Sequence, residues 1–400
     1  MNKIDLNYRI FNAIKDVVDS RKVIRPVHLH EPYFKGTNAW KYVKDCIDTG
    51  WVSSSGKWVD LFEEKICEIT GSPYAVSVSN GTVALRLALY VLGVKPGEEV
   101  IIPPLSFVAT ANAVSHLGAN PHFVDIDKNN LGLCHRSLKE RLEKIGVKKG
   151  GLTFNIETGK RIAAVIPVHV FGMPANIPEI LKVLEKWDIP IIEDAAEALG
   201  SFINHKKENC HCGLMGDLGI ISFNGNKIIT TGGGGALLVK KKSIAEKIRH
   251  ISTTAKIPHL WDYDHDEIGW NDRLPNLNAA LGYAQLEDFQ SRLQKKSLLS
   301  ENYYKVFKNI KEVELVRDNS KNICNYWLST LRLLGKNGSL LRERRDSLLD
   351  FSYANKIFLR PAWKPLHLLP MYKDAPKGRL DVIKDQEFRL INLPSSPQII

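Results

Sequence analysis

No apolar run in this sequence reaches the length of about 18–20 residues that a membrane-spanning helix needs. Residues 1–18 carry charges throughout and lack the apolar centre of a signal peptide. The six cysteines show no paired framework, which fits a reducing compartment. These absences predict a cytoplasmic protein with no membrane association.

The sequence also lacks the Walker pattern and the G-x-G-x-x-G pattern, which excludes the usual P-loop and dinucleotide sites. Paired C-x-x-C spacings are missing as well, so we expect no metal site. The weak candidate formed by His205, Cys210, His211 and Cys212 is better interpreted as a polar surface loop.

Positive charge is in excess, because 55 lysines and arginines against 44 aspartates and glutamates give a net charge of +11. The basic clusters at residues 240–250 and 341–346 are short and typical of solvated helix faces, and no nucleic-acid-binding motif accompanies them. We therefore expect no nucleic-acid partner. Such a positive field would equally attract a small molecule that carries phosphate.

Short apolar segments alternate with amphipathic helical patterns from about residue 74 to residue 250. Strands are predicted at residues 74–79, 98–104, 120–127, 161–170, 189–196, 218–224 and 234–239. Helices are predicted at residues 81–93, 107–118, 177–187 and 242–250. Strands that are apolar on both faces and alternate with helices predict an α/β fold with a mostly parallel central sheet.

The pattern changes after about residue 275, and a chain of 400 residues is long enough for roughly two domains. A long helical pattern is followed by a strand-like segment at 325–334 and by a helix near 338–355, as in a small α+β domain. The predicted organisation is an N-terminal arm (residues 1–35), a large α/β domain (36–275) and a smaller C-terminal α+β domain (276–400).

One lysine stands out because Lys227 is the only charged residue between Leu218 and Val239, in a chain that is 25% charged. A buried lysine costs several kcal/mol unless it is paired or neutralised. Burial would also lower the pKa of its amine and make it a nucleophile for imine chemistry. The alternative is a lysine whose ammonium extends to solvent along its apolar stem.

Two further segments end predicted strands, where ligands bind in parallel sheets. Asn80-Gly81-Thr82 opens a helix and would offer backbone N–H groups to a phosphate, although Asn80 or Thr82 could equally be an ordinary helix cap. Asp194 ends an apolar strand, and Glu197 follows at capping-box spacing, so Asp194 is either a cap or a carboxylate for a buried cation. Together with Ser222 and Lys227, these parts are what pyridoxal phosphate (PLP) needs.

Eight segments extend this pattern and resemble the DegT/StrS-type nucleotide-sugar aminotransferases from about residue 28 to the C-terminus. They are SNGTVALRLAL, PPLSFVATANAV, PHFVDID, IPVHVFGMPANI, IIEDAAEALGS, IISFNGNKIITTGGGGALL, WNDRLPNLNAALGYAQLE and PLHLLPMY. The resemblance implies a fold-type I enzyme that uses PLP and its amino form, pyridoxamine phosphate, and works as a homodimer with shared active sites.

The resemblance also implies a role for each matching residue. Lys227 would form the Schiff base and move protons, and Asp194 would pair with the pyridine nitrogen. The remaining cofactor contacts would come from Thr82, Val83, Phe107, Glu197, Ser222 and, across the dimer interface, Asn271. Glu197 departs from the family, because many relatives have glutamine there, and this leaves the environment of the ring hydroxyl open.

The branch of the family is suggested by residues 29–36, 51–63 and 252–270, which resemble enzymes of the legionaminic acid and bacillosamine type pathways. This implies amino transfer from L-glutamate to C4 of a UDP-linked 2-acetamido-2,6-dideoxy-4-hexulose for bacterial surface glycans. The substrate residues would be Ser53, Ser54, His169, Arg360, Trp363 and His367. The alternatives are a GDP- or dTDP-linked 3- or 4-keto sugar, or a non-catalytic binding protein on the same fold.

Overall fold

The computed structural model describes residues 3–19, 25–318, 320–336 and 338–400. Its centre is a mixed sheet in the order β1-β11-β10-β7, extended by β6-β2-β3 through parallel bridges from Val165 to Ile191 and from Val168 to Asp194. The bounds are β1 (Tyr74–Val78), β2 (Glu99–Ile102), β3 (Asn120–Phe123), β6 (Ile162–Val165), β7 (Ile192–Asp194), β10 (Leu218–Ser222) and β11 (Gly235–Val239).

Most neighbours in this sheet are parallel, as predicted. β10 runs parallel to β7, and β2 runs parallel to β3 and β6, whereas β11 runs antiparallel to β1 and β10. Every residue of β10 and β11 is buried, which explains their uninterrupted apolar sequences. The α/β fold with a mostly parallel central sheet is therefore confirmed.

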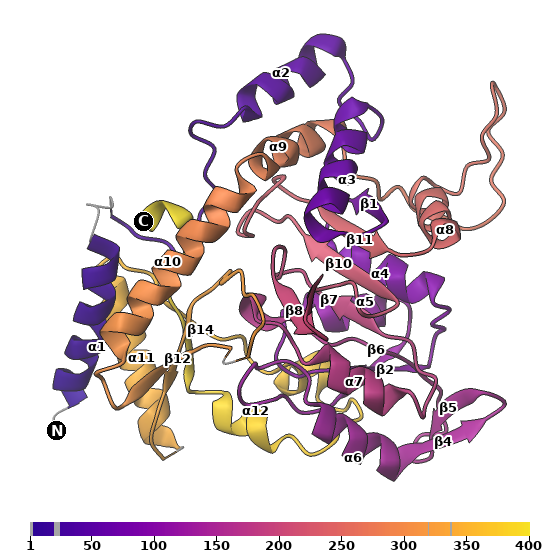
Figure 1. Cartoon of the computed structure of the whole chain (residues 1–400). Helices are drawn as coiled ribbons and strands as arrows, with labels where there is room; N and C mark the ends of the chain where they lie inside the picture. The colour runs from indigo at the N-terminus through magenta and orange to yellow at the C-terminus, as the bar shows by residue number, and fades with distance from the viewer. Residues whose placement is uncertain (1–2, 20–24, 319, 337) are drawn as a thin grey trace.

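Helices pack around this sheet because its strands need cover on both faces (Figure 1). They are α2 (Ala39–Thr49), α3 (Lys57–Thr70), α4 (Gly81–Val91), α5 (Ala109–His116), α6 (His135–Ile145), α7 (Ile177–Leu184) and α8 (Lys242–Ser252). Two antiparallel hairpins form separate two-stranded sheets: β4 (Gly146–Lys149) with β5 (Leu152–Asn155), and β8 (Phe202–His205) with β9 (Glu208–His211).

A second, antiparallel sheet follows in the order β12-β13-β15-β14. This part contains α9 (Asn276–Leu286), α10 (Phe289–Phe307), β12 (Val313–Val316), β13 (Thr330–Leu333), α11 (Ser339–Ala354), β14 (Arg360–Pro361), α12 (Asp381–Gln386) and β15 (Leu390–Asn392). The long helical pattern predicted after residue 275 is two helices, because Asp288 leaves helical geometry at φ −103° and ψ 11°.

The predicted N-terminal arm contains a helix, α1 (Lys3–Val18), that lies against α10 and α11 (Figure 1). Leu6, Ile10 and Ile14 recur at helical spacing and are buried in a second core with Tyr303 and Leu348. This part of the arm therefore packs as an element of the smaller unit. Residues 1–2 and 20–24 of the predicted arm lie outside the described residues, and the division at residues 35 and 275 stays a prediction.

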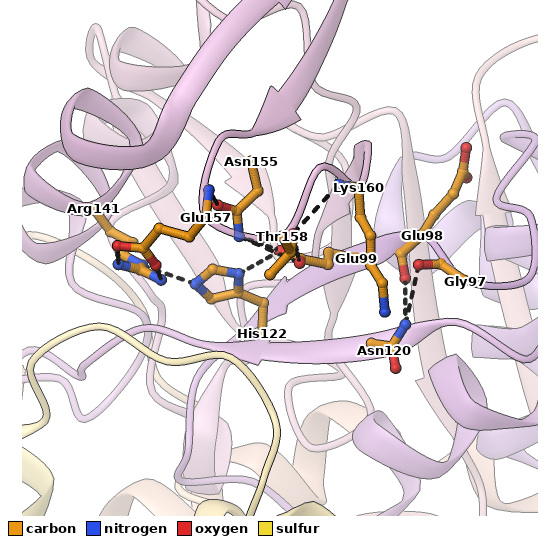
Figure 2. Close-up of polar contacts among 10 residues, drawn as sticks. All are labelled: Gly97, Glu98, Glu99, Asn120, His122, Arg141, Asn155, Glu157, Thr158 and Lys160. Atoms are coloured by element: carbon orange, nitrogen blue, oxygen red, sulfur yellow. Dashed lines mark hydrogen bonds and ion pairs between the residues drawn. The ribbon is translucent and has the colours of Figure 1, made fainter.

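A buried polar network closes the far edge of the central sheet (Figure 2). The Glu99 carboxylate, which is fully buried, accepts hydrogen bonds from His122 Nδ1 at 2.7 Å, Asn155 Nδ2 at 2.9 Å and Thr158 Oγ1 at 2.6 Å. Arg141 Nε donates to His122 Nε2 at 3.0 Å. The network joins β2 and β3 to the loop after the β4–β5 hairpin, where apolar packing alone would leave these groups unpaired.

Glu99→Ala is expected to lower the free energy of unfolding by about 3–5 kcal/mol, because it leaves several buried donors without an acceptor. The matched control is Glu143→Ala, whose half-exposed carboxylate lies 3.9 Å from Lys139, and we expect it to cost less than about 0.5 kcal/mol. Urea denaturation of both variants measures the difference. Equal, small losses would show that the network contributes nothing specific.

Candidate active site

A cavity of about 290 Å³ opens where β7 and β10 end and α4 begins. In an open α/β sheet this is the edge where ligands bind. The polar and aromatic residues that line it include Asn80, Thr82, Ser106, Phe107, Thr110, Asp194, Glu197, Ser222, Asn224, Asn226, Lys227, Trp327, Arg360 and Trp363. The structure thus brings together most of the residues that the sequence singled out.

Asp194 lies at the floor of the cavity and is 3% exposed. One of its carboxylate oxygens accepts a hydrogen bond from Thr110 Oγ1 at 2.7 Å, and the other accepts the backbone N–H of Ala196 at 3.2 Å. Burial nevertheless raises the pKa of this carboxyl, because hydrogen bonds to Thr110 and Ala196 only partly offset desolvation. A cationic ligand would relieve that cost.

Lys227 enters the cavity from the turn after β10, and its side chain is 11% exposed. Its Nζ lies 3.2 Å from Glu197 Oε1 and 4.0 Å from the centroid of the Trp327 ring. The lysine that is isolated in the sequence is therefore paired in space with a carboxylate and an aromatic face. The alternative of an ammonium that extends to solvent is wrong.

Glu197 is held on its other side as well. Its Oε2 accepts the backbone N–H of Phe171 at 2.8 Å, from a residue whose φ is +57°. Burial raises the pKa of this carboxyl, and the charge of Lys227 opposes the shift. Gly172 has a φ of +91°, and a Cβ there would lie 1.9 Å from Asn325 Oδ1, so this turn requires glycine.

The first turn of α4 supplies the anion-binding end of the cavity. The side chain of Asn80 caps the helix by accepting the N–H of Val83 at 2.9 Å, and its backbone carbonyl accepts the N–H of Ala84. The N–H groups of Gly81 and Thr82 then remain for a phosphate. A Cβ on Gly81 would lie 3.1 Å from that of Ser222, so the helix end and β10 meet closely here.

Some expected residues lie elsewhere. His169 is fully buried outside the cavity lining, where its Nε2 lies 3.0 Å from Glu193 and its Nδ1 accepts the N–H of Ala175, so its ring has no free nitrogen for a substrate. His367 is buried near Phe123, and burial lowers its pKa to about 4. Neither histidine lines the cavity, and the same is true of Ser53, Ser54, Val83 and Asn271.

Val83 and Asn271 differ from the sequence interpretation in separate ways. The N–H of Val83 is bonded to Asn80, so within this chain Gly81 rather than Val83 accompanies Thr82. Asn271 is exposed and pairs with Thr253 at the base of the loop that projects from the body between α8 and α9 (Figure 1). Its expected contact therefore depends on a second copy of the chain.

The weak metal candidate is not a polar surface loop. His205, Cys210 and His211 belong to the β8–β9 hairpin, and His211 and Cys212 are buried. His211 Nε2 accepts the N–H of Gly200 at 2.8 Å, and burial lowers the pKa of this ring to about 4. Among the described residues, the group compact enough for a metal is instead His250, Asp266 and Glu267, and Lys247 pairs with Glu267 there.

Sequence inspection did not single out Thr110, Trp327 or Asn226. Thr110 lies within the motif PPLSFVATANAV, so the sequence could place it near the edge of the sheet. Its hydrogen bond to Asp194 could not be predicted from that motif. Trp327 comes from the distant segment before β13, and its Nε1 donates to the carbonyl of Asn226 at 2.8 Å. A contact between residues 101 positions apart cannot be predicted from a local sequence pattern.

The arrangement fits PLP. A buried carboxylate without a cationic partner among the described residues suits the pyridine nitrogen. The N–H groups at the N-terminus of α4 suit the phosphate, and the nearby amine suits the aldehyde. The cofactor would supply an electron sink at the carbon that loses or gains the amine. Fold and site together define a fold-type I PLP-dependent enzyme.

The chain belongs to the DegT/DnrJ/EryC1/StrS aminotransferase family, whose model matches residues 35–400. It is therefore a PLP-dependent sugar aminotransferase that acts on nucleotide sugars. It is 33% identical to a GDP-perosamine synthase of Escherichia coli O157:H7 over 93% of this chain and 94% of that protein.

Two further relatives bear on substrate and fold. A UDP-4-amino-4,6-dideoxy-N-acetyl-beta-L-altrosamine transaminase of Campylobacter jejuni is 36% identical over 67% of this chain and 65% of that protein. The crystal structure of the aminotransferase TlmJ from Streptoalloteichus hindustanus matches with a TM-score of 0.81 at 25% identity, covering 92% of this chain and 93% of that one. No helix among the described residues is long and apolar enough to span a membrane.

The expectation that Asp194 caps a helix is wrong, because β7 is followed by turns and then by β8. Asp194→Asn tests whether this carboxylate acts on the cofactor or only on the fold. Because the folded-state pKa of Asp194 is raised, its charge destabilises the cofactor-free fold above the unfolded pKa. At neutral pH the variant without cofactor is thus expected to melt no lower than the wild type, yet to lose most turnover. Calorimetric melting and turnover assays check both results. Preserved activity would leave Asp194 a structural role only, in the turn where it accepts the N–H of Ala196.

Proposed function

We propose that this enzyme moves the amino group of L-glutamate to C4 of a UDP-linked 2-acetamido-2,6-dideoxy-4-hexulose in the synthesis of bacterial surface glycans. The observation that supports amino transfer is the buried Lys227 amine, which shares one cavity with Asp194 and the N-terminus of α4. The UDP-linked substrate is supported by the resemblance at residues 29–36, 51–63 and 252–270, and by the similar altrosamine transaminase.

The residues divide the work by position. Lys227 Nζ would hold the cofactor and move the proton at the reacting carbon, and Asp194 would keep the pyridine nitrogen protonated. Glu197 Oε1 would accept a hydrogen bond or a proton from the lysine, at the present distance of 3.2 Å. Thr82 and Ser222 would hold the phosphate, and Phe107, which is 54% exposed at the cavity mouth, would cover the ring.

A GDP-linked 4-keto sugar is the second candidate, because the GDP-perosamine synthase similarity covers 93% of the chain. The amino-transfer chemistry would be the same for both, so the difference must lie in the pocket for the nucleotide and for the substituent at C2. Arg360 and Trp363 line the cavity and are the expected substrate residues that this chain itself supplies there.

We further propose a homodimer in which each cavity is completed by the partner. The loop between α8 and α9 projects from the body (Figure 1) and exposes Leu260 (90%), Trp261 (72%), Tyr263 (75%) and Ile268 (79%) to solvent. Apolar surface of this kind typically marks an interface. Asn271 at the base of this loop would reach the cofactor phosphate of the neighbouring chain, as each interface contact occurs twice in a two-fold dimer.

Lys227→Ala is expected to abolish turnover, because no other amine lines the cavity among the described residues. The wild type, loaded with cofactor and glutamate, is then offered UDP-, GDP- and dTDP-linked 4-keto sugars, and the aminated products are measured by mass spectrometry. We expect product with the UDP-linked acetamido sugar. Turnover only with the GDP-linked sugar would establish the second candidate, and near-wild-type turnover in Lys227→Ala would remove the lysine from the mechanism.

Mixing two differently impaired variants tests whether each active site is built from both chains of the dimer. Asn271→Ala should weaken cofactor binding by about 1.5–3 kcal/mol, since it removes one hydrogen bond to a charged group. When Lys227→Ala and Asn271→Ala chains exchange at limiting cofactor, a mixed dimer carries both defects in one site and none in the other. Activity should then exceed that of either parent. No recovery in dimers shown to exchange would place Asn271 outside the partner's site.

A further inference from the structure

A second cavity of about 320 Å³ adjoins the active-site cavity, and Arg360 and Asn226 line both. His28, Leu29, His30, Leu328, Phe358 and Leu359 complete its lining. The residues come from the chain before α2, from the turn that carries Lys227, and from the segments that flank β13 and β14. The two cavities therefore share Arg360 and Asn226 as a common wall.

The polar groups at this junction have no hydrogen-bond partner among the described residues. They are Nε and Nη2 of Arg360 and both ring nitrogens of His30, which is 9% exposed. Buried polar groups are normally paired, and several unpaired groups around one cavity indicate a ligand that the chain alone does not supply. The side-on pair Nε and Nη2 has the fork geometry that binds two oxygens of a planar carboxylate.

The charges around the junction favour an anion. Burial, Lys296, Lys227 and Arg292 lower the pKa of His30, so its ring is neutral and donates one N–H. Glu197, the nearby carboxylate, is already paired with Lys227 at 3.2 Å. Arg360, 5.6 Å from the centroid of the Trp363 ring, is thus a half-buried cation whose Nε and Nη2 have no partner among the described residues.

We propose that Arg360 and His30 form the subsite for a carboxylate of the amino donor, with Arg360 bound side-on and His30 donating to the same group. This rests on the proposed aminotransferase function and replaces the expectation that Arg360 contacts the nucleotide sugar. Arg360 lines the cavity of Lys227 as well as the second cavity, so a donor held there keeps its amine near the reacting centre. A diphosphate is the competing anion, and the two half-reactions separate these sources.

The first test uses glutarate, a five-carbon dicarboxylate that cannot react, titrated calorimetrically into the cofactor-loaded protein. Arg360→Gln and His30→Leu are each expected to weaken glutarate binding by on the order of 10- to 100-fold, the usual effect of a hydrogen bond to a charged group. Arg360→Lys keeps the charge without the fork and should also lose at least about tenfold. Arg379→Gln, an exposed arginine paired with Asp381, is the control and should bind as the wild type does.

The second test measures each half-reaction alone. With glutamate, the Arg360 and His30 variants should need about 10- to 100-fold more donor for half-maximal cofactor amination. With protein loaded with pyridoxamine phosphate, their KM for the nucleotide sugar should stay within about threefold of the wild type. Unchanged glutarate binding with a raised KM for the nucleotide sugar would assign the fork to the diphosphate and overturn the proposal.

Two controls keep the outcomes distinct. Melting temperatures identify any variant that fails to fold, and Arg360→Lys, which keeps the charge, then carries the test. Wild-type binding of glutarate and normal amination by glutamate in all folded variants would overturn the subsite. If no nucleotide sugar reacts, the proposed function fails, but glutarate binding and amination by glutamate still test the carboxylate subsite.

Discussion

The buried pair of Lys227 and Glu197 is the interaction on which the site depends. A buried ion pair is favourable only when its geometry and remaining hydrogen bonds offset desolvation. Glu197 therefore receives the N–H of Phe171, and its backbone carbonyl accepts Nδ2 of Asn325 at 2.8 Å. Asn325 Oδ1 in turn accepts the N–H of Trp327 at 2.8 Å, which sets the indole against the lysine. Lys227 therefore contacts residues from both parts of the fold: Glu197, which follows β7 of the central sheet, and Trp327, which precedes β13 of the second sheet.

Much of this could be predicted from sequence because it is local. Strands buried on both faces have largely apolar sequences; Asp194 ends one such strand, β7, and Lys227 lies in the turn after another, β10. What could not be predicted depends on distant contacts. Glu197 is 30 residues from Lys227 and had a capping spacing of its own, while Trp327 is separated from Asn226 by 101 residues. His169 was misplaced because a histidine at a strand end looks the same whether it faces a cavity or the carboxylate of Glu193.

The cavity must serve two different substrates in turn, and the structure suggests how. In the proposed mechanism the inner groups, Asp194, Lys227 and the N-terminus of α4, would act on the cofactor in the same way whichever substrate is bound. Selectivity for the nucleotide sugar would then depend on Trp363 and on whatever the partner subunit contributes through its projecting loop, while Arg360 would serve the amino donor. Such a division would let one inner site serve different nucleotide sugars, and the similar proteins are named for both GDP- and UDP-linked sugars.

The central claim is that the cofactor is bound to the amine of Lys227, and chemical trapping tests it most directly. The chain offers a competitor, because Lys296 is fully buried and desolvation lowers its pKa to about 7. Borohydride reduction of the cofactor-loaded protein fixes the cofactor to whichever amine holds it, and peptide mass spectrometry locates the label. The structure predicts one label on the peptide that contains Lys227, and a label on Lys296 or on no single lysine would contradict it.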